Sequence, residues 1–355
     1  MEDITYAYWL ANISGISPRV RLNLYEQCKS AREIWNLSGE ELKKQYGVTE
    51  EAAVCISRSK AGWDPGREWE RLQERGISFV SMEQDTYPKR LRNLYDPPFG
   101  LYYIGRLPKE DAKSVGIVGG RACSRYGQDM AKRSGKCMAL NGVSVISGMA
   151  RGIDGYGHEG ALDGGGSTYA VLGCGVNVVY PPEHASLYER IIAHGGVLSE
   201  YPPDTRPHPG YFPMRNRIIA GLSDLLLIIE AKEKSGSLIT ADCALEQGKD
   251  IFAAPGRMTD PLSAGCNRLI RQGAGILLSP EELVGELGLL QEKNKLLLEK
   301  SERLVYSCLD LLPKSMEKIS EETALDIATL AEILFSLEEK GLVREAWQNH
   351  YISVN

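Results

Sequence analysis

Two neighbouring stretches, VGIVGGR (115–121) and VSVISGMARGID (143–154), decide the fold class of this chain. Each opens with a short run of β-branched and other apolar residues that does not alternate in polarity, and glycine follows the run directly. Such runs are typical of parallel strands that are buried on both faces of a sheet. Because a helical stretch follows each run, both stretches predict βαβ units and therefore an α/β domain.

The same pattern continues along the chain as far as residue 285. Further short apolar runs occur at Tyr169–Leu172, Val197–Leu198, Leu225–Ile229, Ile251–Ala253 and Ile276–Leu278. Helical stretches separate most of these runs. We therefore expect an extended Rossmann-like, doubly wound parallel sheet, which binds its ligands at the carboxyl ends of the strands.

The flanks have patterns of their own. Residues 1–65 have apolar positions at helical spacing and predict a small helical domain, and the break at Ala61–Gly66 marks its end. Residues 66–110 form a connector with a short helix and a strand (Ile77–Val80). We count this connector with the sheet region as one domain, 66–285. Residues 286–303 form a charged linker or helix. Helices followed by two short strands over 304–355 predict a winged helix.

The composition limits the classes of function. The chain has 355 residues and a net charge of −6, so DNA binding requires a local basic patch on an acidic protein. There is no apolar run of the ~18–20 residues that a membrane span needs, and no signal peptide pattern, so we expect a cytoplasmic protein. None of the eight cysteines forms a C-x-x-C pair, so we expect no metal site.

Three glycine-containing loops are expected at one edge of the sheet. Gly120 and Arg121 follow the first run, Ser147 and Gly148 follow the second, and Gly173 follows the third. Glycine there lets backbone N–H groups approach phosphate oxygens, although the same loops can be tight turns without a ligand. G-x-G-x-x-G and the P-loop pattern are both absent, so no cofactor is expected.

A basic and aromatic segment, RPHPGYFPMRNR (206–217), supplies the required patch. It contains Arg215 and Arg217 beside Phe212 and has no acidic residue. Cations hold phosphates while an aromatic face stacks an unpaired base, which is how single-stranded nucleic acid is bound. The alternative is that Phe212 fills the core while the arginines pair with carboxylates.

Lys234, Ser235 and Gly236 lie between a strand and a helix and form a candidate phosphate site. The alternative is simple N-capping of that helix by Ser237, and both readings can hold together. Catalytic groups are sparse, since the histidines are scattered and Asp154 and Glu230 have ordinary structural roles open to them. We therefore expect no catalytic residue.

Seven motifs in order resemble the DprA/Smf family of DNA-processing proteins. They are Gly120–Gly127, SGMARGID (147–154), AVLGCGVNVVYP (170–181), LSEYPP (198–203), FPMRNRIIAGLSD (212–224), EAKEKSGSLITA (230–241) and the segment from Ala254 to Ala274. Together they cover roughly residues 80–280. The flanks resemble the family's N-terminal SAM-like domain and C-terminal winged helix more weakly.

The resemblance implies a homodimer that binds and protects single-stranded DNA and loads RecA in natural transformation or related recombination, with single-strand-binding protein as a further partner. It places Gly120, Arg121, Phe212, Arg215 and Arg217 in the DNA pocket, and less firmly Ser147, Gly148, Lys234, Ser235 and Gly236. The apolar run Leu225–Ile229 and the helix of the 240s are candidate dimer surfaces.

This chain departs from the family at Gly155 and Tyr156, where alanines are usual, and at Asn177, where aspartate is common. Pro209 stands where some relatives have a basic residue. The expected recognition helix of the winged helix, around Leu325–Lys340, is acidic, so we expect it to serve protein contact or regulation. Two other functions stay open: a nucleotide-processing enzyme related to phosphoribohydrolases, whose PGG-x-GT-x-x-E loop is not matched, and a winged-helix transcription factor with a ligand-sensing domain.

Overall fold

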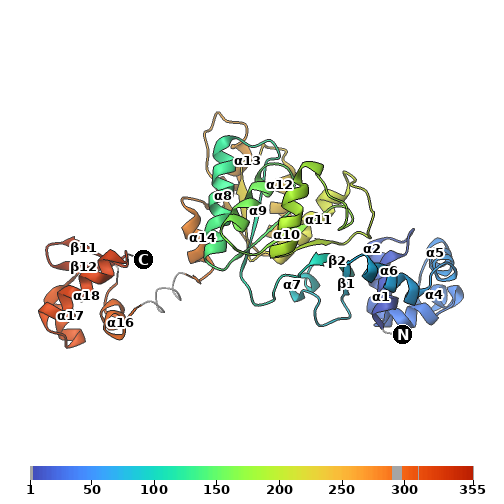
Figure 1. Cartoon of the computed structure of the whole chain (residues 1–355), viewed down its shortest axis with the longest axis horizontal. Coiled ribbons are helices and arrows are strands. Elements are labelled where there is room, and N and C mark those ends of the chain that lie inside the picture. The colour runs from blue at the N-terminus through green and yellow to red at the C-terminus, as the bar shows by residue number, and fades with distance from the viewer. Residues whose placement is uncertain (1–2, 290–297, 311, 355) are drawn as a thin grey trace. The chain divides into compact units, whose positions relative to one another are not determined.

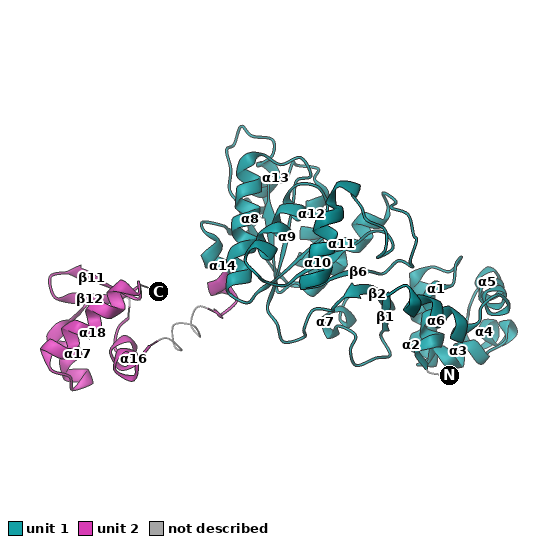
Figure 2. Cartoon of the chain, viewed as in Figure 1, with its two compact units in different colours: residues 1–283 teal, residues 284–355 magenta. Residues whose placement is uncertain are grey.

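The computed structural model describes residues 3–289, 298–310 and 312–354 (Figure 1). The chain divides into two compact units, Met1–Leu283 and Val284–Asn355 (Figure 2). Of the linker expected over 286–303, residues 290–297 lie outside the described ranges, and Lys300 already begins α16 (Lys300–Ser307). Among the described residues, every helix is too short or too polar to cross a membrane.

A nine-stranded sheet forms the centre of the first unit, in the spatial order β1-β2-β6-β5-β4-β3-β7-β8-β9. The strands from β6 to β9 in that order pair in parallel. They are β3 (Ser114–Gly119), β4 (Ser144–Ser147), β5 (Thr168–Val171), β6 (Gly196–Ser199), β7 (Leu225–Ile229), β8 (Asp250–Ala253) and β9 (Gly275–Ile276). The expected doubly wound parallel sheet is therefore confirmed.

The order of the strands contains one switch point. From β3 the chain proceeds outward through β4 and β5 to β6, and then returns to place β7 on the other side of β3. Loops from β3 and β7 leave in opposite directions at such a point, so a crevice opens at the carboxyl ends of the strands. β7 itself is buried along its whole length in the middle of the sheet, so it cannot serve as the dimer surface that its apolar composition indicated.

Helices cover both faces of this sheet. α8 (Arg125–Leu140) and α9 (Ile153–Asp163) pack closely on each other, as do α11 (Tyr211–Leu222) and α12 (Gly236–Glu246). The largest cluster of buried side chains joins α11 and α12 to the sheet through Ile218, Ile219, Leu226, Ile228 and Ala241. The remaining helices of this part are α10 (Ala185–His194), α13 (Ala264–Arg271) and α14 (Pro280–Glu286).

The N-terminal helices share a core with the antiparallel edge of the sheet. β1 (Ser78–Ser81) pairs with β2 (Gly100–Gly105), and β2 pairs with β6. Tyr8, Trp9, Phe79 and Tyr102 belong to one cluster of buried residues. The helices are α1 (Asp3–Asn12), α2 (Pro18–Cys28), α3 (Ala31–Asn36), α4 (Gly39–Tyr46), α5 (Glu50–Ala61) and α6 (Pro65–Glu74). The SAM-like assignment of this part stays a prediction.

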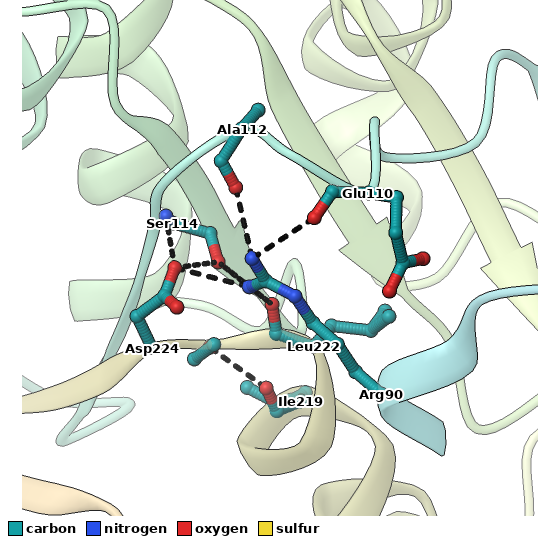
Figure 3. Close-up of polar contacts among 8 residues, drawn as sticks. Arg90, Glu110, Ala112, Ser114, Ile219, Leu222 and Asp224 are labelled. Carbon is teal, nitrogen blue, oxygen red and sulfur yellow. Dashed lines mark hydrogen bonds and ion pairs between the residues drawn. The ribbon is translucent and has the colours of Figure 1, made fainter. Parts of the chain in front are cut away.

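An arginine clamp closes the end of the sheet opposite to the crevice (Figure 3). Arg90, from α7 (Lys89–Arg92), donates to Asp224 Oδ2 and Ser114 Oγ, both at 3.0 Å. It also donates to the carbonyl oxygens of Ala112 at 3.1 Å and Leu222 at 3.3 Å. Since Asp224 also accepts from Ser114 N at 2.8 Å, the clamp ties the connector to the starts of β3 and β7.

The second unit contains three described helices and a small antiparallel sheet. The helices after α14 are α16 (Lys300–Ser307), α17 (Met316–Thr323) and α18 (Ile327–Glu339), and the strands are β10 (Lys314–Ser315), β11 (Val343–Trp347) and β12 (His350–Ser353). The strand order is β10-β12-β11. Helices before a terminal hairpin agree with the expected pattern, while the assignment to the winged-helix class stays a prediction.

Candidate nucleic-acid-binding site

A cleft of about 600 Å³ opens at the carboxyl ends of the parallel strands, beside the switch point. Its walls come from Gly119–Ala122 at the end of β3, from Ala150 after β4, from Lys232 and Lys234–Ser237 around the start of α12, and from the start of α11. A second, smaller hollow shares Arg121, Tyr180, Phe212 and Arg215 with it and extends to Gly148 and Gly173. The loops that the sequence singled out therefore converge on one place.

A stack of cationic and aromatic groups stands in this cleft. The Phe212 and Tyr180 rings lie 5.7 Å apart with an angle of 25° between their planes. The Arg121 guanidinium lies over Phe212, with its central carbon 5.4 Å from the ring centroid. Phe212 is only partly buried, so it is not the core plug of the alternative reading. This arrangement offers an aromatic surface beside a positive charge, which suits an unpaired base and its phosphate.

The positive charges of the cleft are available to a ligand. Arg121, Lys232 and Lys234 are exposed and line the cleft. None of the three forms an ion pair within the described part of the chain. When unpaired cations of this kind bind phosphates, the counterions that surround the nucleic acid are released. This release drives much of the affinity for nucleic acid.

The start of α12 forms the wall next to these lysines. Ser235 caps the helix, and its hydroxyl accepts from Ser237 N at 3.4 Å. The Ser235 and Ser237 hydroxyls are 2.8 Å apart. Ser235, Gly236 and Ser237 all line the cleft, so the capping role of this turn coexists with the exposed N–H groups that favour an anion.

A buried charged pair supports the floor of the cleft. Arg215 and Asp154 are 5% and 6% exposed. Arg215 Nη1 donates to Gly148 O at 2.9 Å and to Val171 O, while Asp154 Oδ2 accepts from Gly148 N at 3.1 Å. Burial raises the pKa of Asp154, and the nearby Arg215 charge opposes that rise. Burial likewise lowers the pKa of Arg215. Both side chains therefore hold the loop at Gly148 rather than face solvent.

Close packing explains why glycine occupies two positions of these loops. A Cβ at Gly148 would lie 2.5–2.6 Å from the Arg215 guanidinium. Gly152 has φ +75°, and a Cβ there would lie 2.2 Å from Gly120 O. The loop after β4 is thus pressed against the loop that carries Arg121.

A second buried carboxylate holds the Arg121 loop from the other side. Glu230, at the end of β7, is 4% exposed and accepts from Ser124 N at 2.7 Å as well as from the Ser124 hydroxyl. Ser124 is in turn the N-cap of α8. Glu230 therefore fixes the path of residues 120–124 and has a positioning role, through Ser124 and not through the nearby arginine that its sequence context suggested.

The structure brings together most of the predicted site residues but not all of them. Gly120, Arg121, Phe212, Arg215, Lys234, Ser235 and Gly236 line the cleft, and Gly148 lines the smaller hollow. Ser147 is fully buried, and its hydroxyl donates to Ile117 O at 2.5 Å. It therefore supports the sheet below the cleft.

Arg217 also lies outside the walls of both hollows. Its Nη2 donates to both carboxylate oxygens of Glu200, at 2.8 and 2.9 Å, and its Nε donates to Asp96 O at 2.9 Å. Arg215 and Arg217 are two positions apart on α11 and so point to different sides of that helix. The pairing with carboxylates that the sequence left open applies to Arg217.

Several residues of the cleft were not singled out by the sequence. Tyr180 follows a run of valines, and only the fold brings it against Phe212. Lys232 precedes the predicted Lys234 by two positions and was visible as a second cation in the same loop. Of the departures from the family, Pro209 lines the cleft, while Tyr156 lies under Lys132 on the α8–α9 side.

Comparisons with known proteins identify the family of this chain. Residues 78–288 match the family described as DNA recombination-mediator protein A. The chain is 35% identical over 294 residues to a Synechocystis protein named Smf, covering 81% of this chain and 74% of the relative. It is 40% identical over 216 residues to DNA processing protein DprA of Bacillus subtilis, covering 61% of this chain and 73% of that protein.

Solved structures give the same result. The X-ray structure of DprA from Streptococcus pneumoniae superposes with a TM-score of 0.71 at 34% identity, and the match covers 81% of this chain and 99% of that one. A structure that describes the single-stranded DNA binding mode of DprA from Helicobacter pylori matches at a TM-score of 0.54 and 31% identity, over 59% of this chain and 95% of the other. The fold, the cleft and these matches together place the chain in the DNA recombination-mediator protein A family, also called DprA/Smf.

Proposed function

We propose that the cleft beside the switch point binds single-stranded DNA. The observation that carries this proposal is the Arg121–Phe212–Tyr180 stack in a cleft whose lysines have no ion-pair partner among the described residues. A base can stack on an aromatic ring only when it is unpaired, so this geometry favours a single strand over a duplex. The H. pylori relative, which binds single-stranded DNA, supports the same choice.

The wider role follows from the family. We propose that the protein acts in the cytoplasm as a recombination mediator without catalytic activity, protects incoming single strands and delivers RecA onto them, in natural transformation or related recombination. Single-strand-binding protein would then be a competitor for the same strand. The family description as a recombination mediator supports this role, and the cleft groups are suited to hold a strand rather than to cleave it.

A homodimer is part of the same proposal. Ile276 and Leu278, at the β9 edge of the sheet, are 42% and 70% exposed, and Leu245 on α12 is 59% exposed. Apolar side chains that are exposed together with an open sheet edge favour coverage by another chain. The helix of the 240s thus keeps a place among the candidate dimer surfaces, in contrast to β7.

The test is equilibrium binding of the full chain to a labelled oligonucleotide, single-stranded and duplex, over a series of salt concentrations. We expect preference for the single strand and an affinity that falls steeply with salt, with a slope of about −0.7 per phosphate contacted. Duplex preference, or no binding, would contradict the proposal. Release of free base from a nucleoside monophosphate would instead favour the nucleotide-processing enzyme.

A further inference from the structure

A second aromatic cluster lies one strand farther along the same edge of the sheet. The walls of the two hollows follow the carboxyl ends of β7, β3, β4 and β5. β6 is the next strand, and Tyr201 follows it by two residues. Tyr201 N donates to Ser199 Oγ at 3.0 Å, which fixes the turn after the strand. Since neighbouring strands are only about 4.8 Å apart, this turn continues the row of loops that forms the cleft.

The cluster consists of Tyr201, Tyr211 and His208, which we call the tyrosine platform. The Tyr201 and Tyr211 rings are stacked, with centroids 4.2 Å apart and 28° between their planes. His208 lies 5.2 Å from Tyr211 and is exposed. Tyr211 directly precedes Phe212 on α11, so the platform and the stack in the cleft begin from consecutive residues. Neither Tyr201 nor Tyr211 lines either hollow.

The electrostatics of the platform favour a phosphate. The two carboxylates in its loop are both matched by arginines: Glu200 by Arg217 at 2.8 Å, and Asp204 by Arg75 at 2.8 Å. Arg206 is exposed and has no ion-pair partner in the described ranges. His208 Nδ1 accepts from Gly210 N at 3.2 Å, so the ring proton is on Nε2, where it can be donated.

The loop is also held in place before any ligand arrives. Asn177 donates to Asp204 Oδ1 at 2.8 Å and accepts from Asp204 N at 2.9 Å. Thr205 O accepts from Gly175 N at 2.9 Å, which ties the loop to the turn after β5. An aspartate at 177 would face Asp204 with like charge, so Asn177, one of the departures from the family, fits this arrangement. A pre-ordered surface loses less entropy on binding.

We propose that the tyrosine platform is a second binding subsite for single-stranded DNA, which takes the bases that leave the cleft on its β5–β6 side. A base lies against Tyr211 and His208, while Arg206 and His208 meet the adjoining phosphates. This inference rests on the proposed function, because it extends the path of the same strand. It also gives Arg217 a role near the DNA, as the residue that neutralises Glu200, the residue before Tyr201.

The test is the affinity of the full chain for oligothymidylates of stepwise increasing length. Short strands fill only the cleft, so Tyr211→Ala should bind them as the wild type does. Beyond a threshold length the wild type should gain affinity, and Tyr211→Ala should lack at least about fivefold of that gain, since one stacked base contributes about 1–3 kcal/mol. Phe212→Ala should weaken binding at every length.

Two further variants keep the result interpretable. Phe335→Ala removes an aromatic side chain that is 63% exposed on α18 of the second unit, and it should behave as wild type. Arg206→Glu changes an exposed side chain and should show the same length-restricted loss even if Tyr211→Ala does not fold. If both Tyr211→Ala and Arg206→Glu follow the wild type at all lengths, the subsite is wrong. If the wild type binds no oligothymidylate, the proposed function fails with it.

Discussion

The two ends of the parallel sheet each carry an arginine, and the structure uses the two arginines in opposite ways. At the amino end, Arg90 meets Asp224, a serine hydroxyl and several carbonyl oxygens (Figure 3). At the carboxyl end, Arg121 is exposed, lies over Phe212 and has no carboxylate partner among the described residues. The first arginine has its hydrogen bonds satisfied by the fold, whereas the second leaves them for a ligand.

The comparison shows how a protein with a net charge of −6 can hold a polyanion. Two carboxylates beside the cleft, Asp154 and Glu230, are buried and occupied with backbone or hydroxyl groups. The exposed Glu233 lies between Lys232 and Lys234 in sequence but does not line the cleft. Much of the excess negative charge lies elsewhere, since residues 299–354 contain eleven acidic residues against six lysines and arginines. The position and pairing of charges thus decide binding more than their total does.

The largest expected effect is on stability and comes from Arg90→Ala. Removing the guanidinium leaves Asp224 largely buried without its cation, so the free energy of unfolding should fall by about 3 kcal/mol. Urea unfolding of the variant and the wild type measures this. Affinity for single-stranded DNA, corrected for the folded fraction, should stay unchanged; a large loss of affinity would break the distinction between the two ends.

The reciprocal changes are Arg121→Ala and Phe212→Ala. Each should weaken binding of a single-stranded oligonucleotide by about 1–3 kcal/mol, roughly five- to 150-fold, and leave the unfolding midpoint near that of the wild type. Arg121→Ala should also reduce the salt dependence, because a phosphate contact is lost. Binding titrations with both variants check this, and full affinity in both would place the DNA elsewhere.

The buried histidine of α9, His158, makes the stability of the fold depend on pH. Thr168 Oγ1 donates to Val145 O at 2.9 Å and lies 2.6 Å from His158 Nδ1, so His158 holds its proton on Nδ1. Its Nε2 has no partner within the described residues. Burial lowers the pKa of His158 from 6.5 to about 3. The unfolded chain therefore takes up a proton below about pH 6.5 that the folded chain refuses, and stability falls toward pH 3.

This contribution amounts to roughly 1.4 kcal/mol at pH 5.5 relative to pH 7.5. Glutamine does not titrate, so the difference in unfolding free energy between the wild type and His158→Gln should shrink by that amount as the pH is lowered. Denaturation curves at the two pH values give the result. A difference that does not change with pH would show that the pKa of His158 is the same in the folded and the unfolded chain.

The smallest effect is expected from removal of the second unit. α18 presents Glu332, Glu338 and Glu339 at its exposed surface, and Lys340 is bound to Glu302 at 2.6 and 2.7 Å. Phosphates are repelled by such a helix. A chain that ends at residue 289 should therefore bind a single strand within about twofold of the full chain. Loss of most of the affinity in a folded, dimeric truncation would assign DNA contact to this unit.

The sequence predicted the parallel sheet because each buried strand is a continuous apolar run. It did not predict β2, although Leu101–Ile104 is such a run, because the preceding Asp96-Pro97-Pro98 reads as a turn in a connector. At the site, glycines and a basic aromatic segment indicated the correct loops. Arg215 is buried against Gly148 O and Val171 O, whereas Arg217 pairs with Glu200, and this division depends on the direction of each side chain from α11.

The measurement that tests the central claim most directly is photo-crosslinking of the full chain to a single-stranded oligonucleotide that carries 5-iodouracil, followed by identification of the modified residues. Iodouracil reacts preferentially with aromatic side chains that stack on it. We predict crosslinks at Phe212 and Tyr180, which disappear when unlabelled single strand competes. Crosslinks confined to residues 299–354, or to the amino end of the sheet around Arg90, would contradict the assignment of DNA binding to this cleft.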